Sequence, residues 1–330
     1  MTTEGSLPPM AEKPPRILYV TGWMRSGSTL LGNVLNELPG VLHVGELHYL
    51  WQNGVLESGT NSDCGCGLSL RDCPLWSAVL TATQSATPDA TATAHHVTMR
   101  QHALLRTRHT RTRLAEARGE TVPAPGITEL LDRTADIYRL VAREGGDRLI
   151  VDGSKYPAEA AALLGRSDLD VRVLHVVRDP RATALSYRRS KQYIDPMSPA
   201  RSSNYWTAFN LASELIGESA GGRYLRIRHE DLSQRPKDVV TEVLRFAGLD
   251  DASPVDESGK VHLSGNHTVT GNPDRLRQGE TLIRPDSRWH TELSAADTAT
   301  VTALTAPLLA RYGYPVLPGR VWPSPEKDLG

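Results

Sequence analysis

The stretch VTGWMRSGSTLL, residues 20 to 31, decides the fold. It joins an apolar run to a segment that can form a helix, and Gly22 and Gly27 have the Gly-x-x-x-x-Gly spacing of a nucleotide-triphosphate loop. Such a loop has a lysine where this chain has Ser28, and the strongest positive charge nearby is Arg25. Backbone N–H groups at a helix N-terminus, hydroxyls and a guanidinium together form an oxyanion-binding set. The stretch therefore predicts a strand, an anion-binding turn and a helix, with a ligand other than the end of ATP.

Similar apolar runs recur along the chain and alternate with helical segments. The clearest are RILYVTG, VLHVG, DRLIVDGSK, VRVLHVVRDP and RYLRIRHEDL. Unbroken apolar strands that alternate with helices predict an α/β fold, with a parallel sheet flanked by helices. Ligands of such sheets bind outside the carboxyl ends of the strands, so the polar residues there should meet in one crevice. These residues are Arg25 to Thr29, Glu46, Ser154 and Lys155, Arg178 and Asp179, and His229 to Asp231.

Length and composition set the broad class of the protein. A chain of 330 residues can form one large domain, which we expect over 16–330 after a disordered tail at 1–15. Within it we expect a helical insertion at about 76–146 and a lid loop at 254–290. The net charge of −1 argues against nucleic-acid binding. There is no apolar run of about 18 residues and no signal-peptide pattern, so we expect a cytoplasmic protein without a membrane span.

Two segments leave alternatives open. Cys64, Cys66 and Cys73 are the only cysteines of the chain. They are consistent with a structural turn, a disulfide, or a metal site with His48 or Asp63 as the fourth ligand. The basic stretch 95–120 predicts a helix, whose charged side is either a solvated face or a wall that binds the acceptor.

A second anion site is predicted by HVVRDPRATALSYRRSK. Arg178 ends a strand in this stretch, and Ser186 lies two turns into the next helix. Both side chains can converge on a phosphate, although a surface pair of Arg178 with Asp179 is the alternative. Two anion sites at one crevice suit a nucleotide with phosphates at both ends of its ribose.

These motifs resemble those of sulfotransferases that use 3′-phosphoadenosine 5′-phosphosulfate (PAPS). RSGST at 25–29 resembles their 5′-phosphosulfate loop, and VVRDPRATALSY at 176–187 resembles their 3′-phosphate motif. The stretch 265–289 is similar to the C-terminal loop of the carbohydrate-type and bacterial members. The resemblance implies a P-loop-like fold and PAPS as the donor. The residues implied in donor binding are Arg25, Ser26, Gly27, Ser28, Thr29, Arg178, Ser186, His229 and Arg275, and less directly Asn266, His267 and Asn272.

The resemblance also implies roles in catalysis. Arg25 and Lys155 are the candidate cations for the charge that develops on the leaving phosphate, and no metal is expected in the reaction. Glu46 is the first candidate for the general base and His48 the second. The acceptor is expected to be a hydroxyl of a small molecule, such as a specialised metabolite, a glycolipid or a sugar. The alternatives are a P-loop kinase or NTPase-like protein, and a nucleotide-binding module without catalysis.

Overall fold

The computed structural model describes residues 13–58, 61–85, 89–145, 148–188 and 195–316. Most of the tail expected at 1–15 lies outside these ranges. The boundaries of the single domain expected over 16–330 stay a prediction.

A five-stranded parallel sheet forms the centre of the chain, in the order β2-β3-β1-β4-β5. The expected α/β class with a P-loop-like strand–turn–helix is therefore confirmed. Since β1 is the middle strand, the turn that follows it lies between the ends of β3 and β4. The strands are β1 (Arg16–Thr21), β2 (Val41–Gly45), β3 (Leu149–Lys155), β4 (Asp170–Val177) and β5 (Tyr224–Arg228).

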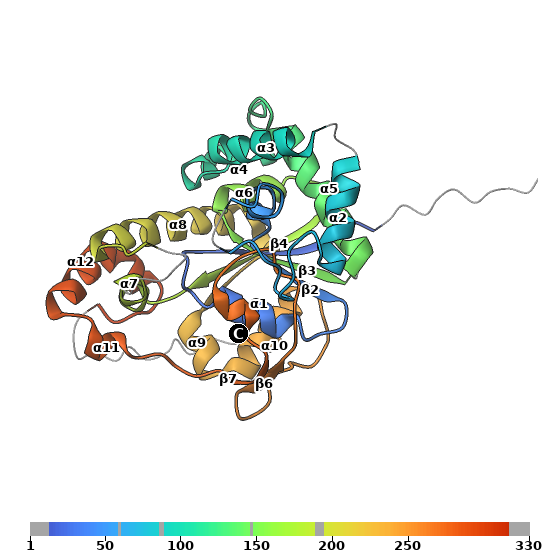
Figure 1. Cartoon of the computed structure of the whole chain (residues 1–330). Helices are drawn as coiled ribbons and strands as arrows, with labels where there is room; N and C mark the ends of the chain where they lie inside the picture. Colours follow the sequence, from blue (N-terminus) through green and yellow to red (C-terminus); the bar gives the residue numbers. More distant parts are fainter. Residues whose placement is uncertain (1–12, 59–60, 86–88, 146–147, 189–194, 317–330) are drawn as a thin grey trace, which may run out of the picture.

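Both faces of the sheet are covered by helices, which explains why the inner strands β1 and β3 are buried on both faces. In β1, Ile17 and Tyr19 pack into one hydrophobic core, while Leu18 and Val20 pack into another on the opposite face. Figure 1 shows α1, α9 and α10 on one side of the sheet and α5, α6 and α8 on the other. These helices are α1 (Ser28–Leu35), α5 (Ile127–Gly145), α6 (Pro157–Leu163), α8 (Pro199–Ala220), α9 (His229–Gln234) and α10 (Pro236–Phe246).

Helices occupy most of the connection between β2 and β3. A 3₁₀ turn (Leu47–Tyr49) and a π-helical turn (Leu50–Val55) come directly after β2. The remaining helices before α5 are α2 (Pro74–Ser85), α3 (Ala90–Leu104) and α4 (Thr110–Ala117).

The expectation of one continuous basic helix over 95–120 is wrong. The chain leaves the helix at Leu105, which has φ −113° and is buried in the hydrophobic core, and a 3₁₀ turn (Thr107–His109) leads into α4. The buried Leu105 is therefore the C-cap of α3 and not a residue within one long helix.

The segment 254–290, called the lid segment below, contains regular structure rather than a plain loop. An antiparallel pair of strands, β6 (Lys260–Leu263) and β7 (Gly279–Leu282), encloses a short 3₁₀ turn (Pro273–Leu276). The short helix α11 (Trp289–Glu292) and the long helix α12 (Ala295–Arg311) follow. Within the described residues, no helix combines the length and the apolar character that crossing a membrane would require.

Candidate active site

The turn after β1 has an unusual backbone. Arg25 and Gly27 have φ 69° and φ 87°, in the left-handed region. Gly27 is the N-cap of α1 and provides no side-chain cap, so the first N–H groups of the helix are not used by a capping side chain. A helix N-terminus of this kind favours an anion. The turn thus has the geometry that the sequence predicts for an oxyanion site.

Gly27 also permits close packing against α9. A Cβ built at this position would lie 2.4 Å from Nδ1 of His229. Burial, followed by the positive charge of Arg178, lowers the pKa of His229 to about 3. A neutral imidazole therefore packs against the turn, at the start of α9 rather than within a strand as RYLRIRHEDL had predicted.

Direct hydrogen bonds join the two sequence motifs. Nε of Arg25 donates to Oγ of Ser186 on α7 (Pro180–Arg188) at 3.0 Å. Nη1 of Arg178, just after β4, donates to the carbonyl oxygen of Arg25 at 2.8 Å. Nη2 of Arg178 forms an ion pair with Asp286 of the lid segment at 3.0 Å. Arg178 and Ser186 were expected to meet on a phosphate. In the structure each of them contacts Arg25, so the three residues lie together.

An acid–base pair lies at the ends of the two neighbouring strands. Nζ of Lys155, the last residue of β3, is 2.5 Å from Oε1 of Glu46, which follows β2. The same ammonium donates to the carbonyl oxygen of Gly153 at 2.8 Å. The Lys155 side chain is 6% exposed and that of Glu46 is 17% exposed. Glu46 is thus the more accessible partner of the pair.

The turn and the Glu46–Lys155 pair line one cavity of about 330 Å³, within the size range of ligand pockets, whereas Arg178, Ser186 and His229 are not among its lining residues. Its lining includes the turn, the Glu46–Lys155 pair, the 3₁₀ and π turns after β2 and part of the lid segment. The lining residues are Met24, Arg25, Gly27, Ser28, Thr29, Leu30, Glu46, Tyr49, Gln52, Asn53, Ser58, Asn61, Lys155, Thr270, Gly271, Asn272 and Asp274.

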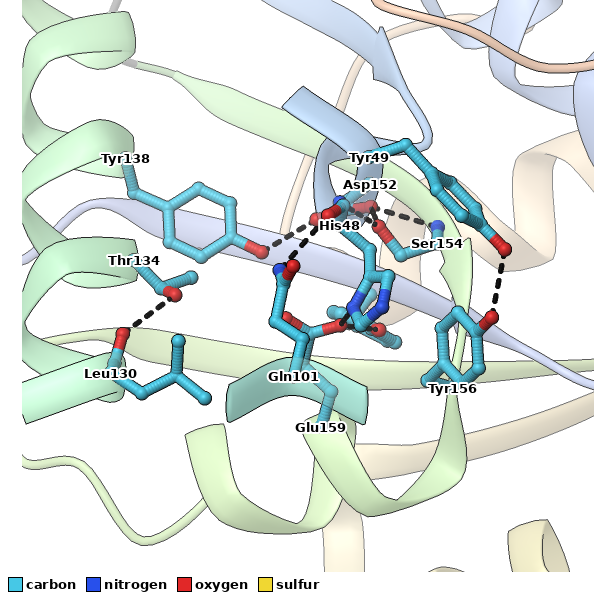
Figure 2. A network of polar contacts seen from close by, with 11 residues as sticks. His48, Tyr49, Gln101, Leu130, Thr134, Tyr138, Asp152, Ser154, Tyr156 and Glu159 are labelled. Carbon is cyan, nitrogen blue, oxygen red and sulfur yellow. Dashed lines mark hydrogen bonds and ion pairs between the residues drawn. The ribbon is translucent and has the colours of Figure 1, made fainter. Parts of the chain in front are cut away.

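His48, the second candidate for the base, belongs to a buried polar network instead (Figure 2). Its Nδ1 is 2.8 Å from Oε2 of Glu159, and its main-chain N–H donates to Ser154 at 2.9 Å. Its imidazole is not part of the cavity lining. The structure therefore gives His48 a place in the protein interior rather than at the cavity, and Glu46 stays the candidate for the base.

Comparison with known proteins identifies the family. A family model described as "Sulfotransferase family" matches residues 15–253. The chain belongs to the sulfotransferase family. The resemblance found in the two sequence motifs is thereby confirmed, as is the prediction that the protein is an enzyme of this class.

A curated relative and two solved structures are similar to this sulfotransferase. Carbohydrate sulfotransferase 3 of Homo sapiens is 24% identical over 165 residues, which are 44% of this chain and only 34% of the human protein. The sulfotransferase domain of the Synechococcus PCC 7002 olefin synthase is 22% identical, with a TM-score of 0.48 over 90% of this chain and 96% of that one. The sulfotransferase domain from the curacin biosynthetic pathway is 17% identical, with a TM-score of 0.49 over 90% and 98%.

Arg275, expected to bind the nucleotide, is not among the residues that line the cavity. Its side chain is buried, and Nη2 donates to Oδ1 of Asn61 at 2.7 Å and to the carbonyl oxygen of Asp63 at 2.8 Å. Arg275 therefore connects the lid segment to the loop before α2. His267 also lies elsewhere, with Nδ1 3.2 Å from Sγ of Cys73.

Asn266 and Asn272, the weaker candidates of the lid segment, have different positions. Asn266 is buried and donates to the carbonyl oxygen of Arg275 at 2.7 Å, so it supports the lid segment internally. Asn272 lines the cavity. Ser26 is buried within the turn and is not among the lining residues.

Sequence reasoning missed part of the cavity lining. Tyr49, Gln52, Asn53 and Asn61 follow β2 and were not singled out. Their place after the end of a strand was the only feature of the sequence that could have indicated them, because the 3₁₀ and π turns leave no periodic pattern. Thr270 and Asp274 are more than 200 residues further along the chain, and their position depends on the fold of the lid segment.

Proposed function

We propose that this sulfotransferase transfers a sulfuryl group from PAPS to a hydroxyl of a small-molecule acceptor. The observation that carries the proposal is the cavity in which the anion-binding turn, Lys155 and Glu46 meet. The 5′-phosphosulfate would lie at the N-terminus of α1, where the N–H groups and the guanidinium of Arg25 favour negative charge.

The link between the two motifs supports a donor with a 3′-phosphate. Ser186 and Arg178 both contact Arg25, so an anion at these residues would lie beside the turn. Nε of Arg178 is buried and has no hydrogen-bond partner among the described residues. A phosphate would satisfy this N–H group and would compete with Asp286 for the same guanidinium.

The reaction is an in-line displacement at sulfur. The acceptor oxygen forms a bond to sulfur while the bond from sulfur to the bridging phosphate oxygen breaks. The acceptor proton goes to the carboxylate of Glu46, and adenosine 3′,5′-bisphosphate (PAP) leaves with the electron pair of the broken bond. Arg25 and Lys155 stabilise the negative charge that grows on the bridging oxygen, which lowers the barrier more than it strengthens ground-state binding.

The other carboxylates at the strand ends favour this chemistry over a magnesium-dependent NTPase. Asp152 in β3 accepts hydrogen bonds from the Ser154 N–H at 2.8 Å and from the Tyr138 hydroxyl at 2.6 Å. Asp179 after β4 forms an ion pair with Arg181 at 2.6 Å. Both carboxylates are engaged by protein groups, whereas a triphosphate site needs a strand-end aspartate for its metal.

The lining of the cavity includes polar residues besides the turn and the Glu46–Lys155 pair. Among them are Tyr49, Gln52, Asn53, Ser58 and Asn61. Donors and acceptors of this kind suit a hydroxyl-rich molecule, and we propose a sugar, a glycolipid headgroup or a polar metabolite as the acceptor.

Nucleotide-dependent thermal stabilisation tests the donor. PAP without metal, at about 100 times its Kd, should stabilise the chain by about 2.7 kcal/mol, a rise in Tm of about 5 °C. Arg178→Met should abolish the rise, whereas Arg143→Met, on the exposed side of α5, should retain it. Stabilisation by ATP with Mg²⁺ but not by PAP would contradict the proposal.

Transfer of labelled sulfate from PAPS to a panel of sugars and phenols tests the reaction itself. Sulfonated product should form on at least one polar acceptor and should disappear when Arg25 is replaced by alanine. Tight PAP binding with no transfer to any member of a broad panel would favour a nucleotide-binding module without catalysis.

A further inference from the structure

Three cysteines from the loop before α2 and one histidine from the lid segment meet at one site. Cys64, Cys66 and Cys73 lie in the loop before and at the start of α2, and His267 lies in the lid segment. One potential ligand atom from each residue lies within 4.8 Å of those of the other three. Cys64 and Cys73 are fully buried, while Cys66 is half-buried.

The distances within this group match a tetrahedral metal site. The Sγ atoms of Cys64 and Cys73 are 3.4 Å apart, and Nδ1 of His267 is 3.8 Å from the first and 3.2 Å from the second. Around a tetrahedral ion with Zn–S bonds of about 2.3 Å and Zn–N bonds of about 2.0 Å, ligand atoms are separated by about 3.5–3.8 Å. Only small side-chain movements would bring all four atoms to such an ion.

We propose that Cys64, Cys66, Cys73 and His267 bind one Zn²⁺ ion in a structural site. Three thiolates and one imidazole are a soft ligand set that zinc prefers over magnesium or calcium. Four protein ligands complete a tetrahedral shell and leave no position for substrate, so the ion has no role in sulfuryl transfer.

The histidine is the residue that sequence reasoning did not connect with this loop. His48 and Asp63 were the expected candidates for a fourth ligand, but His48 contacts Glu159 instead. His267 is about 200 residues from the cysteines along the chain, and only the folded lid segment brings it to them.

A disulfide would explain less of this arrangement. All three cysteines are free thiols in the structure. A bond between Cys64 and Cys73 would leave Cys66 and His267 without a function at the same point. A zinc ion uses all four groups.

The consequence of zinc binding is a fixed lid segment. Hydrogen bonds already join the same two segments: the Gly65 N–H donates to the Thr268 carbonyl at 2.9 Å, and Nε1 of Trp76 donates to the His267 carbonyl at 2.6 Å. The next residues along the chain, Thr270 to Asn272, line the cavity. The ion would therefore hold one wall of the cavity in place from a distance.

Metal analysis tests the site independently of any enzyme assay. The full chain, purified with a thiol reductant and without chelator, should contain about one zinc per chain by mass spectrometry. Co²⁺ added to metal-stripped chain should give the absorption of tetrahedral cobalt together with sulfur-to-cobalt charge transfer. Cys66→Ser and His267→Ala should each lower the affinity for Zn²⁺ at least tenfold. His262→Ala, at an exposed histidine of β6, is the matched control and should retain full binding.

Three results would overturn the proposal. The first is reduced chain that takes up neither Zn²⁺ nor Co²⁺, and the second is a cobalt spectrum without thiolate charge transfer. The third is a Cys64–Cys73 disulfide in chain purified under the same conditions, seen as an intact mass about 2 Da below that of the reduced chain. If a variant fails to fold, the cobalt spectrum of the unmodified chain decides the matter. Because none of these measurements involves PAPS, failure of the zinc site and failure of the proposed activity are separate outcomes.

Discussion

Replacement of Glu46 by glutamine tests the acid–base pair at the cavity. Glutamine has the shape of glutamate and can still accept a hydrogen bond from Nζ of Lys155, which lies 2.5 Å from Oε1. It cannot take the proton of the acceptor hydroxyl. A positioned general base contributes about 10²–10⁴-fold to a rate, so kcat should fall by that factor. This corresponds to about 3–5 kcal/mol of transition-state stabilisation.

The same substitution should not weaken the binding of PAP. The substitution removes a negative charge from the lining of the cavity that we propose for the anionic donor, so the Kd for PAP should stay constant or decrease. Product formation from labelled PAPS gives kcat, and calorimetry gives the Kd. Glu129→Gln, at a largely exposed glutamate of α5, is the matched control and should behave as the unmodified chain. A kcat within about threefold of the control would remove Glu46 from the role, and so would a loss of PAP affinity equal to the loss of kcat.

Three further perturbations test the turn, the lid segment and the buried histidines. Gly27→Ala places a Cβ 2.4 Å from the His229 imidazole at a residue with φ 87°, so the affinity for PAP should fall more than tenfold. Gly119→Ala, at φ 72° with no atom within 4 Å of the new Cβ, is the control and should leave the affinity unchanged. Equal effects of the two substitutions would contradict the packing argument. Asp286→Asn removes the anion that pairs with Arg178 and should tighten PAP binding about two- to fivefold by calorimetry, and weaker binding would contradict this. Burial lowers the pKa of three histidines to about 3–4, so the unfolded chain takes up more protons than the folded chain as the pH falls through 6.5. The contribution of these histidines to the free energy of unfolding, measured in urea titrations, should therefore fall by about 4 kcal/mol between pH 7.5 and pH 5.5. A constant free energy of unfolding would contradict this prediction. These histidines are His43, His175 and His229.

The sheet was predictable because its strands are short apolar runs that end in polar turns. α8 was not predicted, although it has 22 residues and begins with Ser198 as N-cap and Pro199 in its first turn. Its buried positions include Trp206 but also the polar residues Asn210 and Ser213. A helix whose buried face is partly polar lacks the apolar stripe on which a sequence-based prediction depends. The N-cap followed by proline was the signal that remained.

For the site, we expected polar residues at the carboxyl ends of the parallel strands to meet in one crevice. This rule was sufficient to predict the position of a residue that ends a strand or follows it directly. Glu46 and Lys155 are 109 residues apart, and neighbouring parallel strands bring them to 2.5 Å. The same rule cannot place Arg275 or His267, because they belong to the lid segment, whose path depends on contacts with the loop before α2. Residue type alone suggested a phosphate ligand for Arg275. In the fold its Nη1 donates to Thr268, and its Nη2 donates to Asn61 and to the Asp63 carbonyl.

The backbone strain at the site explains why the two motifs occur together. Among the described residues, only Arg25, Glu57 and Lys155 combine a side chain with positive φ, and two of these are the candidate catalytic cations. A left-handed conformation costs such a residue about 1–3 kcal/mol and persists only where neighbours enforce it. The Arg25 carbonyl accepts from Arg178, and its guanidinium donates to Ser186, so the second motif fixes the first through both backbone and side chain. Lys155 is held through its side chain, because Nζ contacts Glu46 and the Gly153 carbonyl. Arg178 and Ser186, which we propose for the 3′-phosphate, therefore also hold the turn that we propose for the 5′-phosphosulfate. A substitution in either motif should then weaken binding at both ends of the donor.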